Sequence, residues 1–223
     1  GISLTISAIV SSLILGVGRF MVDNAAGIES FGLLSFSVSI TNFFISFVTQ
    51  ISMVMFPALR KLNAECAKNL FLKLRCGLSY VVCIIFLLYG PLCIILGRWL
   101  PNYAISLHYM IFLLPICVFD GKMQMLYNTY LKVLRKERSM LFINLSALVI
   151  SVLLCGIAAF VIKDISAVAL AMMVSVLLRS IIADRYLSKQ MKVKSDTNIL
   201  YELLLTLVYI VSNLALRPLP AMA

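Results

Sequence analysis

Acidic residues and histidine are scarce in this chain, in which Asp and Glu together number 9 and His 1 among 223 residues. Membrane-bound transferases usually need clustered carboxylates, or a histidine with a partner, on a substantial loop. No such cluster occurs, and no P-loop, His-Glu-x-x-His or Gly-x-Ser-x-Gly motif is present. The six cysteines contain no Cys-x-x-Cys pair, and a single histidine offers little to a zinc ion. We therefore expect no enzyme activity, no metal site and no cofactor.

Long stretches of the chain lack charge altogether. Charged residues make up 13% and hydrophobic residues 62% of the sequence, and the mean hydropathy is +1.06. Soluble domains carry about 25% charged residues, so the composition predicts an all-α, polytopic transmembrane helical bundle. A spanning helix needs about 20 residues. Seven segments are candidate spans: Ile2–Val22, Ser30–Leu59, Cys76–Gly97, Ile105–Phe119 with continuation to Tyr130, Met140–Ile162, Ile165–Ile182 and Leu200–Leu216.

Proline and glycine mark the expected irregularities in these segments. A break is predicted at Gly90-Pro91 and a kink at Pro115. Residues Asp23–Glu29 are expected to form a short external loop. No basic leader precedes the first apolar segment, so we expect no signal peptide. Because the chain starts inside an apolar run, we expect a fragment of a longer protein.

Basic residues are distributed unevenly between alternate loops. One side has four of them, namely Arg19, Arg98, Lys163 and Arg217. The other side has fifteen: Arg60, Lys61, Lys68, Lys73, Arg75, Lys122, Lys132, Arg135, Lys136, Arg138, Arg179, Arg185, Lys189, Lys192 and Lys194. Cytoplasmic loops are enriched in Lys and Arg, so the N-terminus is predicted inside and the C-terminus outside. Topology and contact with anionic membrane lipids then explain the net charge of +10, and no nucleic-acid partner is expected.

Arg19 stands near the outer end of the first apolar segment, and three interpretations of it are open. Its guanidinium could extend to the outer membrane interface, as arginine often does near a helix end. It could pair with Asp23, which lies four residues further on. It could instead face an internal cavity and bind an anion.

Amides within the spans are the next candidates, because polar groups are costly in lipid and tend to face a cavity or each other. Asn42 and Gln50 are eight residues apart, about two helical turns, and are predicted to share one helix face. Hydrogen bonding to a neighbouring helix is one interpretation of this pair. The lining of a cavity is the functional interpretation.

A second polar series follows towards the cytoplasmic end of the fourth segment. Asp120, Gln124 and Asn128 recur at (i, i+4) spacing, with Lys122 among them. They could mark only the end of a helix, or they could form one polar face of a cavity. The candidate substrate-binding residues are therefore Arg19, Asn42, Gln50, Asp120, Lys122, Gln124 and Asn128.

Two further charged groups receive simpler interpretations. Arg179 and Asp184 are expected together at the membrane interface, near the end of the sixth segment. The basic stretch KVLRKER at 132–138 is expected to be a solvated loop, with contact to lipid headgroups as the alternative.

Two stretches resemble bacterial polysaccharide flippases of the Wzx type, in the multidrug/oligosaccharidyl-lipid/polysaccharide exporter superfamily. The first, RFMVDNAAGIESFGLLSFSVSITNFFISFVTQISMVMFPALRKL at 19–62, resembles the seventh and eighth helices of these flippases. It contains an arginine that ends a helix, an external turn at 27–32 and the helix exit MVMFPALR at 53–60. The second, YNTYLKVLRKERSMLFIN at 127–144, is similar to the motif that opens the C-terminal part in this family.

This resemblance implies a MATE-like C-terminal lobe, with helices seven to twelve in residues 1–186. A basic cytoplasmic loop and an additional transmembrane helix would occupy residues 187–223. It also implies an N-terminal lobe that is missing here, and a location in the bacterial inner membrane. The substrate would be an undecaprenyl-diphosphate-linked oligosaccharide, which moves outward by alternating access for surface polysaccharide synthesis. Arg19 would then contact the diphosphate.

Three alternatives to a flippase are open. A cation-coupled multidrug antiporter of the same superfamily is the main alternative, and it would need acidic residues deep in a lobe. A membrane polymerase or acyltransferase is disfavoured by the short external loops. A partial product is the third, because a lone lobe leaves cavity residues without partners in lipid. We do not expect the 223 residues alone to transport.

Overall fold

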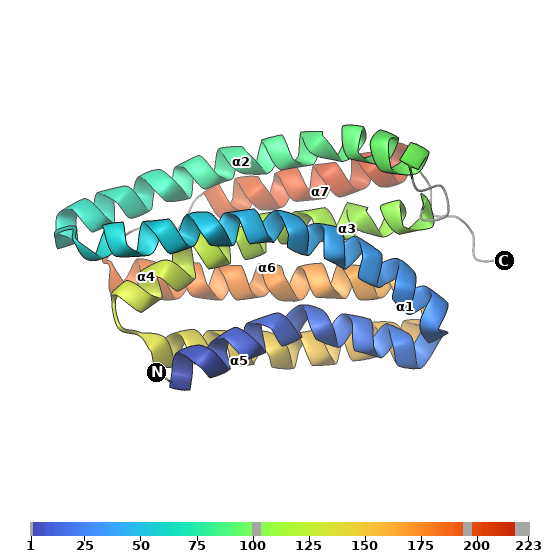
Figure 1. Ribbon diagram of the computed structural model, residues 1–223, viewed down its shortest axis with the longest axis horizontal. Coiled ribbons are helices and arrows are strands. Elements are labelled where there is room, and N and C mark those ends of the chain that lie inside the picture. The colour runs from blue at the N-terminus through green and yellow to red at the C-terminus, as the bar shows by residue number, and fades with distance from the viewer. Residues whose placement is uncertain (1, 100–103, 194–197, 217–223) are drawn as a thin grey trace.

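The protein is a bundle of long helices that lie side by side (Figure 1). The structure, a computed structural model, describes residues 2–99, 104–193 and 198–216, and no strand occurs in these ranges. The elements in chain order are α1 (Ile2–Arg60), α2 (Ala64–Trp99), α3 (Ala104–Lys122), the π-helix η2 (Met123–Tyr127), α4 (Asn128–Val133), α5 (Glu137–Gly156), the π-helix η3 (Ile157–Ile162), α6 (Ile165–Gln190) and α7 (Asn198–Leu216).

Within the described ranges, five helices are long and apolar enough to cross a membrane. They are α1, α2, the α3–η2–α4 rod, the α5–η3 rod and α6. The seventh predicted span corresponds to α7, whose apolar part, Ile199–Ala215, is shorter than these five. The expectation of an all-helical protein is therefore confirmed for the described residues, and five of their helices have the length and composition that a membrane span needs.

A sharp bend at Gly27 divides α1 into two arms, 2–26 and 28–60. Gly27 has φ 82° and ψ 176°, a conformation that is essentially reserved for glycine. The second arm runs back beside the first (Figure 1), and each arm exceeds the length of about 20 residues that a span needs. The predicted loop Asp23–Glu29 was wrong, because these residues are helical apart from Gly27.

The predicted break at Gly90-Pro91 was also wrong. Helix α2 is continuous from Ala64 to Trp99, with Pro91 inside it. A broken helix in lipid exposes several backbone groups, which costs more than the one hydrogen bond that proline removes. The predicted continuation of the fourth segment through Tyr130 was confirmed, since α3, η2 and α4 follow one another without interruption. Its change of geometry lies at η2, and Pro115 stays within α3.

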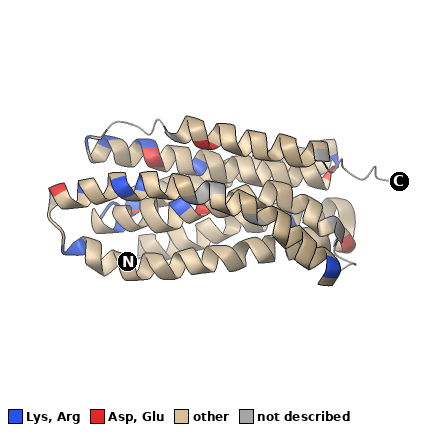
Figure 2. Cartoon of the chain, turned by 90° about the horizontal axis from the view of Figure 1, so that it is seen from above, with Lys and Arg blue, Asp and Glu red and all other residues tan. Residues whose placement is uncertain are grey.

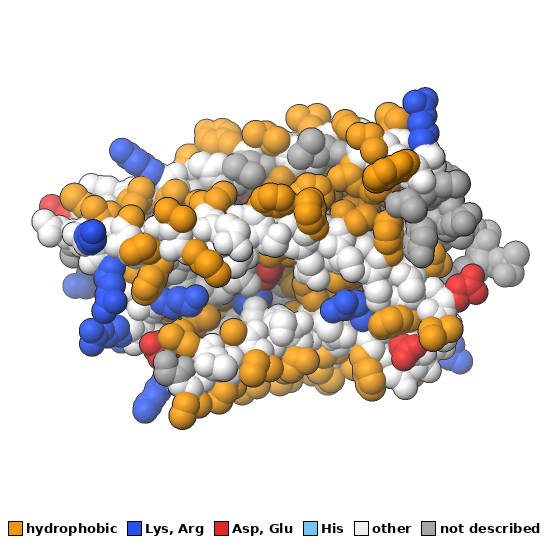
Figure 3. Space-filling view, viewed as in Figure 1, with side chains coloured by type: hydrophobic (Ala, Val, Ile, Leu, Met, Phe, Trp, Pro, Cys, Tyr) orange, Lys and Arg blue, Asp and Glu red, His pale blue; other side chains and the backbone are white. Residues whose placement is uncertain are grey.

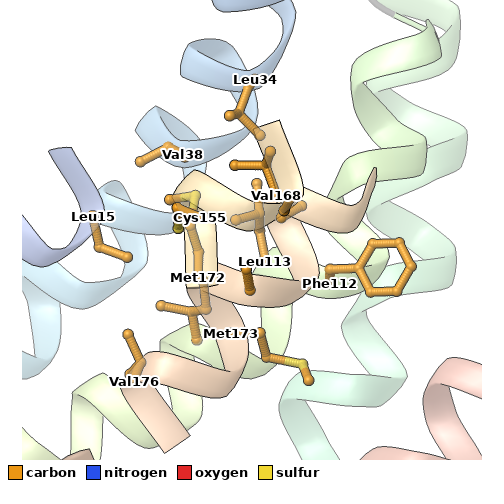
Figure 4. Packing of buried hydrophobic residues seen from close by; sticks show 14 of the residues in the cluster. Leu15, Leu34, Val38, Phe112, Leu113, Cys155, Val168, Met172, Met173 and Val176 are labelled. Atoms are coloured by element: carbon orange, nitrogen blue, oxygen red, sulfur yellow. The ribbon is translucent and has the colours of Figure 1, made fainter. Parts of the chain in front are cut away.

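The main hydrophobic cluster lies where α3, α5 and α6 meet both arms of α1 (Figure 4). Leu15 and Val38 come from the two arms, Leu113 from α3, Cys155 from α5 and Met172 from α6. Because this cluster holds the arms of α1 at fixed positions, it determines the shape of the space between them.

Close approach of α1 and α6 depends on Gly18. A Cβ at this position would lie 2.3 Å from the sulfur of Met172, which is fully buried. We expect Gly18→Val to lower the free energy of unfolding by about 1–3 kcal/mol, because overpacking displaces neighbouring side chains. Thermal unfolding in detergent measures the effect. The matched control is Gly16→Val on the same helix, where a Cβ meets nothing within 4 Å. Equal destabilisation by both variants would contradict the prediction.

Lys and Arg gather at the end of the bundle that holds the N-terminus (Figure 2). The α1–α2 and α4–α5 turns and the end of α6 all lie at this end, whereas the bend of α1 and the η3–α6 turn lie at the other (Figure 1). The described loops therefore alternate between the two ends in the predicted order. Lys194 and Arg217 lie outside the described residues.

The C-terminal part of the chain packs onto the rest of the bundle. The boundary expected after residue 186 falls inside α6, which continues to Gln190. Helix α7 shares a hydrophobic cluster with α2 and α3, in which the ring of Tyr209 stacks on Phe86 with centroids 4.4 Å apart.

Candidate functional site

A cavity of about 700 Å³ lies between the two arms of α1. The rod formed by α3, η2 and α4 supplies a further wall, and the start of α5 lies near its basic end. Figure 3 shows the hollow between the rows of helices, with acidic and basic atoms at its floor. The lining residues are Leu4, Ala8, Ser11, Ser12, Leu15, Arg19, Asn42, Ile45, Thr49, Ser52, Met53, Phe56, Asp120, Gln124, Asn128, Thr129, Lys132, Glu137 and Met140.

Five of the seven predicted site residues line this cavity: Arg19, Asn42, Asp120, Gln124 and Asn128. The other two, Gln50 and Lys122, do not. At about 100° per residue, Gln50 is rotated by about 80° from Asn42, so it lies on an exposed face. Lys122 is two residues from Asp120 and points to the opposite side of α3.

The α3–η2–α4 rod carries a ladder of polar side chains along the cavity wall. The Nδ2 of Asn128 donates to the Oε1 of Gln124 at 3.1 Å, and the Nε2 of Gln124 lies 3.5 Å from the Oδ2 of Asp120. The predicted (i, i+4) face is thus present. The Oδ1 of Asn128 has no hydrogen-bond partner among the described residues. A buried amide oxygen without a donor favours a ligand or a water that supplies one.

The π-helix η2 is braced from the second arm of α1. Ser52 Oγ donates to the carbonyl oxygen of Gln124 at 3.0 Å, and Thr129 Oγ1 donates to the same oxygen at 3.1 Å. The two hydroxyls lie 2.7 Å apart. A π-helical turn displaces backbone carbonyls from their regular partners, and these hydroxyls satisfy the carbonyl at the centre of the wall.

Asp120 is held from behind by a buried arginine of α6. The Nη1 of Arg179 donates to the Oδ1 of Asp120 at 2.8 Å, and its Nε donates to the Oδ1 of Asn144 at 2.8 Å. Its Nη2 donates to the hydroxyl of Ser11 at 2.8 Å. Arg179 is 1% exposed. The prediction that Arg179 and Asp184 lie together at the interface was therefore wrong, because each is buried with a different partner.

A second polar network lies on the other side of the rod. Arg75 of α2 pairs with Asp184 of α6 at 3.1 Å, and the Tyr127 hydroxyl donates to the same carboxylate at 3.3 Å. Lys122 of α3 pairs with Glu202 of α7, which also accepts from Ser79. Arg75 was expected in a cytoplasmic loop, but it is 3% exposed inside the bundle. Its charge is tolerated there because a carboxylate on another helix neutralises it.

Arg19 differs from the buried cations because it keeps a free guanidinium. Among the described residues it has no hydrogen bond and no ion pair, and the possible pair with Asp23 is not formed. Its side chain is partly exposed and lines the cavity. The interpretation that places Arg19 at an internal cavity is therefore the one that the geometry supports.

Several residues that line the cavity were not among the site residues predicted from the sequence. Ser11 and Ser12 stand on the Arg19 face of the first arm, and Thr49 and Ser52 stand on the Asn42 face of the second. Serine and threonine are common in apolar helices, where they bond to the preceding turn, so they give little signal alone. The usable signal was their helical spacing from Arg19 and Asn42.

The geometry above can be compared with that of known proteins. The chain matches no protein-family model, no curated protein and no solved structure. Its function is therefore argued from the cavity and its side chains.

Proposed function

We propose that this chain is one lobe of a membrane flippase that moves a lipid-linked oligosaccharide on an undecaprenyl-diphosphate carrier. The observation that carries the proposal is the free guanidinium of Arg19 in a cavity lined by amides and hydroxyls, within helices that can span a membrane. A guanidinium binds phosphate oxygens through paired hydrogen bonds. Amides and hydroxyls suit the hydroxyls of a sugar.

The position of the cavity also supports a lipid-borne substrate. It lies between two helical arms whose outer surfaces carry exposed apolar side chains, among them Ile9, Phe43 and Phe47. A polar headgroup could occupy such a cavity while its hydrocarbon chain stays beside these surfaces. The proposed mechanism is alternating access, with a second lobe as the partner that closes the open side.

A cation-coupled antiporter is the second candidate, and Asp120 is the observation that favours it. Asp120 is buried, with 6% of the residue exposed, and it lines the cavity. Its pairing with Arg179 reduces the charge that it offers to a transported cation, so we rank this function second. Unchanged drug sensitivity on deletion of the gene, together with loss of surface polysaccharide, would decide for the flippase.

Replacement of Arg19 tests the proposal. In a host without its own flippase, we expect the full-length gene with Arg19→Ala to lose surface polysaccharide export by about tenfold or more, because a charge-assisted contact contributes about 1.5–3 kcal/mol. Arg19→Lys is expected to retain part of the export, because it keeps charge but not the paired geometry.

The matched control is Arg98→Ala, an exposed arginine of α2 outside the cavity. Surface polysaccharide is measured together with the amount of protein in the membrane. Normal export by both Arg19 variants, at normal protein levels, would remove the proposed role of Arg19 and the main support for this function.

A further inference from the structure

A second hollow, of about 740 Å³, is lined by residues at the basic end of the bundle. Phe56, Lys132 and Glu137 line both this hollow and the cavity, so the two lie next to each other. We call this hollow the basic mouth, because five cations surround it: Arg60, Lys132, Arg135, Lys136 and Arg138.

The cations of the basic mouth form no ion pair with any residue that the structure describes. Among the described residues that line it, the only acidic one is Glu137. Like charges that converge on one concave surface raise the local positive potential. Such a surface attracts anions, phosphates above all, because arginine offers them paired donors.

The backbone conformation of the α4–α5 turn does not require basic side chains at positions 135 and 136. Arg135 has φ 54°, a left-handed conformation in which glycine or asparagine is favoured at a helix C-terminus. The turn is closed by a backbone hydrogen bond from the N–H of Lys136 to the carbonyl oxygen of Leu131 at 2.9 Å, which any residue other than proline could donate. The geometry of the turn therefore explains neither the arginine nor the charge beside it.

Arg19 is too far from this hollow to belong to it. Ser3 lines the basic mouth, and sixteen residues of helix at 1.5 Å each place Arg19 about 24 Å along the first arm. A diphosphate spans only a few ångströms, so one headgroup cannot contact both positions. The polar ladder from Asn128 to Asp120 lies between them on the cavity wall.

We propose that the basic mouth is a loading site for a phosphate-bearing anion, separate from Arg19. That the bound anion then enters the cavity as the headgroup of a transported lipid rests on the proposed function. The binding itself rests only on the five cations and the hollow that they surround. The source of the phosphate is either a diphosphate headgroup that approaches the mouth or an anionic phospholipid of the surrounding membrane.

Titration with inorganic pyrophosphate tests the loading site. The purified full-length protein is placed in nanodiscs of phosphatidylcholine, and binding is measured by calorimetry. We expect the triple variant R135Q/K136Q/R138Q to bind about tenfold more weakly or worse, because each cation near the anion contributes to its capture. The control triple variant K61Q/R185Q/K189Q removes the same charge from exposed positions outside the hollow, and it is expected to keep most of the affinity.

Repeating the titration in nanodiscs that contain phosphatidylglycerol identifies the source. If this lipid displaces pyrophosphate from the wild type, a phospholipid headgroup occupies the mouth, and if it does not, the mouth selects a diphosphate. Absence of pyrophosphate binding, or equal weakening by both triple variants, would overturn the proposal. Because binding is measured without transport, a negative export assay in the Arg19 experiment leaves this result intact, and the reverse also holds.

Discussion

Replacement of Arg179 by methionine is expected to destabilise the protein by about 3–5 kcal/mol, the cost of stranding one partner of a buried ion pair. The change would remove the Arg179 donor from Oδ1 of Asp120 and from the amide oxygen of Asn144. Methionine fills much of the arginine volume, so the loss reflects charge and hydrogen bonding more than a void. Thermal unfolding in detergent and the amount of protein in the membrane both measure the effect.

A double variant separates the ion pair from other causes. In R179M/D120L neither charge remains, and apolar replacements of a buried pair are often close to neutral. We expect the double variant to recover most of the stability that R179M loses. A double variant as unstable as the single one would show that the pair is not the source of the loss. Export is expected to fail in both variants, because Asp120 lines the cavity and is either deprived of its Arg179 partner or replaced.

The second large effect is expected at the pair between Lys122 and Glu202. Lys122→Met leaves the buried carboxylate of Glu202 unpaired, again at a cost of about 3–5 kcal/mol. Here the loss should concentrate in α7, because Glu202 and the stacked ring of Tyr209 both attach that helix to its neighbours α2 and α3. Hydrogen exchange should show faster exchange of the α7 amides than of the α5 amides.

Lys122→Met with Glu202→Leu is the matched control for this pair. It removes both charges and keeps apolar contacts, so α7 is expected to stay protected from exchange. If α7 exchanges slowly in the single variant as well, the aromatic and aliphatic contacts of α7 are sufficient to hold it. The ion pair would then have no role in docking the helix.

The helices themselves could be predicted from the sequence, because long uncharged runs have few alternatives in a membrane protein. The fold departs from the prediction where local signals are overridden. Pro91 suggests a break in water, but an unbroken helix leaves fewer backbone groups unpaired. The sequence places Gly27 within an expected external turn, whereas in the structure this one residue, with φ 82° and ψ 176°, makes the reversal between the arms of α1.

The candidate site could be predicted in part for a related reason. Spacing on one helix places residues on a face, which correctly grouped Asp120, Gln124 and Asn128. Spacing says nothing about which helix lies opposite. Arg179 therefore could not be assigned to Asp120 rather than to Asp184, which is closer in sequence. Such pairings depend on the packing of helices that are far apart in the chain.

The buried ion pairs bear on how the chain is made and inserted into a membrane. Their partners are 59, 80 and 109 residues apart, so during synthesis each charge that is inserted early waits for a helix that has not yet emerged. An unpaired charge at the centre of a helix opposes insertion by about 2.5–3.5 kcal/mol. Lys122 finds its carboxylate only when α7 arrives, so the earlier helices must remain together at the insertion machinery until α7 is released.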